Sequence, residues 1–160
     1  MSTLRFNTWQ NTGGTEVANS TLGTGKILQV VFTTTTTETS TSSTSYVDTA
    51  CAATITPTSS SNKVLVIVTT ANLSTSNNNA SANLTIYRGD VATGTDLGSD
   101  AMAIAWNATS IVLSPAAMMY LDSPGTTSAI TYTQALRSNN SPNTVYAKSQ
   151  QSMILMEVLA

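Results

Sequence analysis

The sequence has no histidine, a single cysteine and few charged residues, although it is 160 residues long. Without histidine the chain cannot form a Ser-His-Asp or Cys-His nucleophile system, a histidine-ligated zinc site or an imidazole proton shuttle. One cysteine excludes an internal disulfide framework and a cysteine-rich metal site. Six lysines and arginines against eight acidic residues leave a net charge of −2, which provides no basic stripe for nucleic acid. We therefore expect no enzyme, no catalytic residues, no metal or other cofactor, and no nucleic-acid partner.

Long hydrophobic segments are also absent. Met1–Gln10 lacks the apolar core of a secretion signal, and the longest apolar runs are too short to span a bilayer. We therefore predict no membrane partner. Without a secretory route, we expect Cys51 to stay reduced and buried as a small hydrophobic residue.

Threonine, serine and asparagine are abundant, at about 40% of the chain compared with ordinary usage. Hydrophobic residues still make up 41%, and disordered chains combine low hydrophobicity with a high net charge. A chain of this length fits one domain that buries about two thirds of its unfolded surface. Because threonine is β-branched, it favours half-exposed strands over helices. The composition predicts an all-β protein with an outer surface of hydroxyl and amide groups.

The first 25 residues differ from the rest. Leu4, Phe6 and Trp9 are the only large side chains in Met1–Gln10, and a polar, glycine-containing stretch follows to Gly25. This stretch has neither a helical nor a sustained strand pattern. A frayed terminus is one interpretation. We favour an extended N-terminal attachment arm and hinge at residues 1–25, anchored by these three side chains, ahead of a β-sandwich body at 26–160, because exposed aromatics are costly in water.

From residue 26 onward, short apolar segments alternate with turn signals. Lys63–Thr70 is an uninterrupted, largely β-branched run, which predicts a strand buried on both faces. Short strands at this spacing, without a helical period, are typical of an antiparallel β-sandwich or jelly roll. The predicted strands are Lys26–Thr37, Ser45–Ala53, Thr54–Thr56, Lys63–Thr70, Asn83–Arg88, Ala101–Trp106, Ala117–Asp122, Ala129–Arg137, Thr144–Lys148 and Ser152–Leu159.

Asp90, Asp96 and Asp100 form the densest acidic group, on a glycine-containing loop. Three carboxylates could hold Ca²⁺, and two could act as acid and base. The spacing does not match an EF-hand, and aspartates favour turns because they cap local backbone donors. We favour the turn interpretation and regard the three residues as a candidate receptor-facing loop.

Two further patterns have a functional and a structural interpretation. Arg88-Gly89-Asp90 matches an adhesion tripeptide, but three residues match by chance, and Gly89 is explained as a turn. Sugars stack on tyrosines, yet at sandwich spacing a tyrosine more often packs half-buried in the core. The tyrosines concerned are Tyr46, Tyr87, Tyr120, Tyr132 and Tyr146.

Several segments, in this order and spacing, resemble a family of bacteriophage virion proteins that is abundant in marine and freshwater phages, cyanophages included. The segments are GKILQVV (25–31), TSYVD (44–48), ITPTSSSNKVLV (55–66), LTIYRG (84–89), LDSPGTT (121–127) and MILMEV (153–158). The opening STLRFNTWQNTGG (2–14) is similar to a short leader that precedes varied phage domains.

The resemblance implies a non-enzymatic virion protein, assembled in the host cytoplasm, that acts as a short tail-fibre or tail-tip module for host adhesion. It implies a homotrimer, which would also cover the open edges of a sandwich. Its partners would be other tail or capsid proteins, and the neutral surface suits a host surface glycan. The alternative is a capsid cement or decoration protein that stabilises the phage head, which the absence of a long shaft favours. A soluble carbohydrate-binding domain is a more distant alternative.

Overall fold

The computed structural model describes residues 25–76, 80–107 and 113–160. The predicted anchors Leu4, Phe6 and Trp9 lie outside the described residues. Within these ranges the chain is all-β, and it contains no helix long and apolar enough to cross a membrane.

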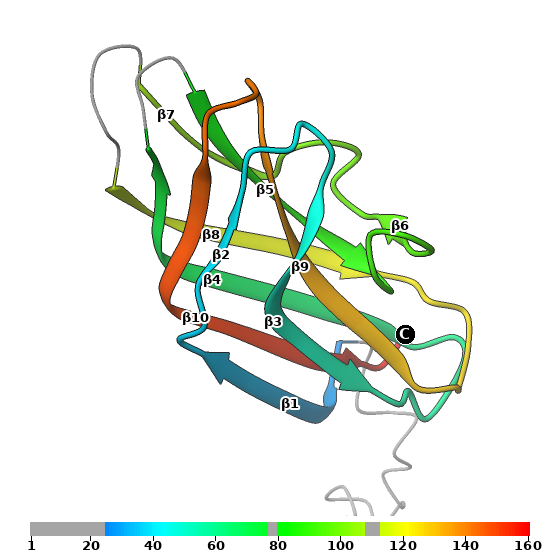
Figure 1. Ribbon diagram of the computed structural model, residues 1–160. Coiled ribbons are helices and arrows are strands. Elements are labelled where there is room, and N and C mark those ends of the chain that lie inside the picture. The colour runs from blue at the N-terminus through cyan, green and yellow to red at the C-terminus, as the bar shows by residue number, and fades with distance from the viewer. Residues whose placement is uncertain (1–24, 77–79, 108–112) are drawn as a thin grey trace, which may run out of the picture.

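Two antiparallel sheets pack face to face (Figure 1). The first sheet has the order β1 (Ile27–Thr35), β10 (Val145–Val158), β4 (Lys63–Thr75) and β8 (Leu113–Asp122), with β2 (Thr39–Thr41) also paired to β10. The second has the order β3 (Val47–Ile55), β9 (Ile130–Ser138), β5 (Ala80–Arg88) and β6 (Thr95–Asp96), with β7 (Ala103–Asn107) also paired to β5. The predicted antiparallel β-sandwich is confirmed.

The core lies between the sheets and follows the two-residue period of the strands. From β4, the inward side chains of Val64, Val66 and Val68 are fully buried. Leu65 and Ile67 alternate with them, point outward and are half-buried. The prediction that this strand is buried on both faces is therefore wrong for the described chain, because nothing in the described residues covers the outer side of the first sheet.

The single cysteine lies in this core. Cys51 on β3 is fully buried and is not part of a disulfide, as the sequence predicted. Burial raises the pKa of its thiol to about 11, which keeps it protonated and unreactive at neutral pH.

The structure joins two pairs of predicted strands. Ser45–Ala53 and Thr54–Thr56 both overlap the single strand β3. Thr144–Lys148 and Ser152–Leu159 form the continuous β10, with a register shift against β4 between Lys148 and Gln151. Ser149, at this bulge, has a φ of 63°. Here β10 changes its second neighbour from β2 to β1. The bulge therefore lets one long strand hold two short strands along one edge.

Candidate interaction surface

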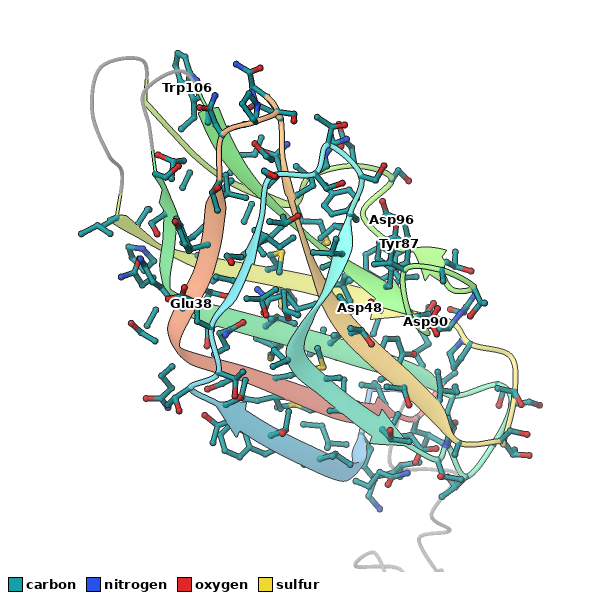
Figure 2. The ribbon with its side chains drawn as sticks, viewed as in Figure 1. Glu38, Asp48, Tyr87, Asp90, Asp96 and Trp106 are labelled. Carbon is teal, nitrogen blue, oxygen red and sulfur yellow. The ribbon has the colours of Figure 1, made fainter. Side chains whose placement is uncertain are left out.

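Each of the three predicted aspartates has its own hydrogen-bond or ion-pair partner in the fold. Figure 2 shows Asp48, Asp90 and Asp96 with Tyr87 on the side of the molecule that carries β6. Asp90 accepts hydrogen bonds from the backbone N–H (2.8 Å) and the hydroxyl (2.9 Å) of Thr93. These bonds, the backbone one first, lower the pKa of Asp90. The aspartate thus closes a turn.

The other two aspartates have different partners. Asp96 accepts hydrogen bonds from the Thr85 hydroxyl (2.7 Å) and the Gly98 N–H (3.0 Å). Asp100 forms an ion pair with Arg137 at 2.5 Å. Across the described ranges, no three acidic or cysteine side chains come close enough to hold a metal ion. The structure therefore brings the loop together without building a cation site.

Two residues of the adhesion tripeptide have structural roles in the fold. Arg88 donates to both carboxylate oxygens of Asp122 at 3.1 Å, and Gly89 turns the chain with a φ of 97°. Asp122 is 5% exposed and also accepts a 2.7 Å hydrogen bond from the buried Tyr132 hydroxyl. Burial, together with this bond to the carboxylate, raises the pKa of Tyr132. These hydrogen bonds connect β8 of the first sheet to β5 and β9 of the second, through Asp122, Arg88 and Tyr132.

The tyrosines near the acidic loop also pack within the protein. Tyr46 meets Tyr87 edge to face, with the ring centroids 6.1 Å apart. The guanidinium of Arg137 lies 4.8 Å from the Tyr46 ring centroid. Burial, the largest influence, raises the pKa of Tyr46 to about 12. One face of the Tyr46 ring is therefore already occupied by a cation.

A buried carboxylate lies at the end of β10 near β1. Glu157 is fully buried and accepts four hydrogen bonds. The donors are the Gln29 amide (2.6 Å), the Thr58 N–H and hydroxyl (both 2.7 Å), and the Asn62 amide (2.6 Å). Desolvation alone would raise the pKa of Glu157. The four hydrogen bonds to its carboxylate have the larger combined effect and lower the pKa to about 2.

The most extensive surface feature is the outer side of the first sheet. Cross-strand pairing aligns outward side chains of β1, β10, β4 and β8 into rows that run across all four strands. Two successive rows are entirely apolar, and we call their eight residues the apolar face. They are Val30, Met156, Leu65 and Leu121 in one row, and Phe32, Ile154, Ile67 and Met119 in the next.

The apolar face is open to solvent. Its outer members Val30, Phe32, Met119 and Leu121 are 49–65% exposed, and its four central members are half-buried. No charged side chain lies in either row. A contiguous exposed patch of this kind marks an interaction site in a soluble protein.

Polar groups border the apolar face. The next row is Thr34, Ser152, Thr69 and Ala117, and an open depression of about 490 Å³ adjoins it between β4, β8 and β10. Lys63 closes the opposite end, where it pairs with Val158. An apolar centre with a polar rim is the usual anatomy of a protein interface.

Sequence reasoning did not identify this surface as a site. The signal that pointed to it was the two-sided burial predicted for Lys63–Thr70, which indicated apolar residues on both sides of the strand. The rows themselves combine residues from positions 30 to 156, so only the strand order reveals them.

Comparison with known proteins relates the fold to virus particles. No protein-family model matches the chain, and no curated protein matches its sequence. VP2 of infectious bursal disease virus, in its subviral particle, is similar with a TM-score of 0.52 and 12% identity, over 81% of this chain and 32% of that one. T=1 particles derived from the same virus give a TM-score of 0.45 and 14% identity, over 82% and 36%. The chain thus spans about a third of the length of these proteins, and it shares a fold with the first.

Proposed function

We propose that this chain is a non-enzymatic structural protein of a bacteriophage virion that assembles with another protein chain through the apolar face. The observation that carries the proposal is the pair of uncharged apolar rows across four strands, because a surface of this kind is stable in water only when another protein covers it. The fold shared with VP2, a protein found in a subviral particle, supports a place in a virus particle.

Within the virion, a short tail-fibre or tail-tip module is the placement that the sequence resemblance favours. The arm at residues 1–25 would then attach the body to the tail. A cement or decoration protein on the head is the second placement, and the likeness to VP2 of a subviral particle supports it. In both placements the apolar face meets protein.

The acidic loop suits contact with the host. The loop packs on the second sheet, whereas the apolar face is the outer side of the first, so the two surfaces lie on opposite layers (Figure 1). With the apolar face covered, Asp90, Asp96, Asp100 and Tyr87 would lie on the layer opposite the covered face. A glycan array checks this role, which Tyr87→Ala should weaken, and binding that Tyr87→Ala leaves unchanged would exclude the loop.

Counting copies of the chain in purified particles tests the proposal. Quantitative mass spectrometry against the major capsid protein as internal standard should detect the chain in every preparation. A few to a few dozen copies per particle support a fibre or tail-tip module, and hundreds support a cement protein. Particles without the chain would overturn the proposed function.

A further inference from the structure

We propose that the apolar face is a homotypic interface, covered in solution by a second copy of this same chain. The inference deepens the proposed function, on which its role in a virion rests. Figure 1 shows the sheet β1-β10-β4-β8 as one complete layer, with β3, β9 and β5 on its inner side only. The outer side therefore has room for a second protein surface of equal extent.

The four outer residues of the apolar face supply about half of the area that a stable protein interface removes from one partner. Val30, Phe32, Met119 and Leu121 are 49–65% exposed. Taking roughly 200 Å² for a fully exposed large residue, these four contribute about 450 Å². The half-buried central members and the bordering row add to this, and a stable pair of proteins removes about 800 Å² from each partner. One partner of matching shape can cover the face.

The charge distribution favours a second copy as that partner. Both apolar rows are free of charged side chains, so two copies meet there without repulsion between like charges. Lys63 and Lys148 lie toward opposite ends of the outer side, on β4 and β10. An uncharged apolar surface is best covered by another uncharged apolar surface, and every copy of the chain carries one.

The geometry of sheet packing supports the same partner. Sheets pack face to face at about 10 Å when both present regular rows of apolar side chains. The apolar face presents two such rows across four strands, as the interior of the sandwich does between its own sheets. A second copy therefore continues the layered packing outward, and a face that packs on its own equivalent gives a two-fold dimer.

Sedimentation velocity of the full-length chain tests the inference, with Phe32→Lys and Met119→Lys as interface variants. Ile104→Lys on β7 is the matched control, because Ile104 is 59% exposed and Phe32 is 60% exposed. We expect a dimer for the wild type and for the control. Each interface variant should weaken association on the order of 100-fold and sediment as one chain. Circular dichroism should show the same strand content in all four proteins.

Other results overturn the inference. A wild-type protein that sediments as one chain at high concentration shows that a different protein covers the face. An assembly that survives both interface variants shows that copies meet elsewhere. An assembly that is lost on deletion of residues 1–24 but kept in the Phe32→Lys variant identifies the arm as the contact. The copy number in particles, measured separately, still decides the proposed virion function in each case.

Discussion

At the scale of single residues, Glu157 is the most unusual group in the protein. A carboxylate buried beside a hydrophobic core is costly unless it is fully hydrogen-bonded. Gln29, Thr58 and Asn62 supply four donors within 2.7 Å. These donors come from β1 and from the link between β3 and β4, so the carboxylate ties both to the end of β10. Its ionised form is therefore part of the fold.

We predict that Glu157 makes the protein sensitive to acid. Its pKa in the folded state is about 2, below the ordinary value of 4.5, so its stabilising contribution is complete above about pH 4.5 and is lost as the pH falls toward 2. Glu157→Gln should lower the free energy of unfolding by about 1–3 kcal/mol at pH 7, because an amide N–H₂ would face hydrogen-bond donors. Urea unfolding at a series of pH values measures the difference between the two proteins.

The difference in the free energy of unfolding between wild type and Glu157→Gln should become smaller as the pH falls from 4.5 to 2. Glu38→Gln is the control, since Glu38 lies exposed in the link between β1 and β2 (Figure 2). Its effect should stay within about 0.5 kcal/mol at every pH. A difference in the free energy of unfolding that stays constant from pH 4.5 to 2 would contradict a lowered pKa for Glu157.

The buried Tyr132 hydroxyl is predicted to stabilise the contact between the sheets. Tyr132→Phe removes the 2.7 Å hydrogen bond to Asp122 and should cost about 1–3 kcal/mol. Tyr120→Phe is the matched control, because the Tyr120 hydroxyl has no hydrogen-bond partner among the described residues, and it should change stability by under about 0.5 kcal/mol. Equal effects in thermal unfolding would show that the bond contributes nothing.

At the scale of elements, the bulge in β10 determines how the first sheet is assembled. Ser149 has a φ of 63°, a conformation that costs a non-glycine residue about 1 kcal/mol. Beside it, the Gln151 amide donates a 2.9 Å hydrogen bond to the Thr37 carbonyl, in the link between β1 and β2. The bulge and this bond together hold β10 where it passes from β2 to β1.

Ser149→Gly is therefore predicted to stabilise the protein by up to about 1 kcal/mol, because glycine adopts positive φ without strain. Ser152→Gly, three residues along the same strand in regular pairing, should instead cost about 0.5–1 kcal/mol. Differential scanning calorimetry at one protein concentration compares the two variants. A loss of stability in Ser149→Gly would show that the positive φ carries no strain.

The sequence predicted most strands, and its errors arise where local patterns end. β2 has three residues and β6 has two, too few to show a period. β10 was predicted as two strands because Ser149, Gln150 and Gln151 interrupt its apolar alternation. The strands predicted at Lys63–Thr70 and Asn83–Arg88 are longer in the structure, since β4 extends to Thr75 and β5 begins at Ala80.

The candidate site was less predictable than the fold. Asp90, Asp96 and Asp100 were identified from their composition, and the structure gives Asp90 a partner within its own turn and pairs Asp96 and Asp100 with β5 and β9. The apolar face needs Phe32, Ile154, Ile67 and Met119 in register, which depends on the order β1-β10-β4-β8. Strand order is set by the whole fold and leaves no local mark in the sequence.

At the scale of the whole molecule, the two sheets of the protein present different surfaces. The first sheet presents the apolar face, and the second carries the acidic loop with Asp90 and Asp96 (Figure 2). The backbone N–H of Gly25 donates to the Leu159 carbonyl at 2.8 Å, so the proposed arm would join the body where β1 begins, at the edge of the first sheet. Both proposed attachment features therefore belong to the same layer.

Deleting residues 1–24 is predicted to abolish incorporation into particles while leaving a folded body. The deletion retains Gly25 and its bond to Leu159, and Leu4, Phe6 and Trp9 are removed. Infection with a phage that encodes the shortened chain, followed by mass spectrometry of purified particles, measures incorporation. Normal incorporation of the shortened chain would contradict the attachment role of the arm.

A density map of the intact particle tests the central claim most directly. The account predicts sandwich-shaped density for this chain, with the outer side of β1, β10, β4 and β8 packed against protein and the acidic loop toward solvent. Density that shows Phe32, Ile67 and Met119 facing solvent, or a particle that lacks the chain, would contradict it.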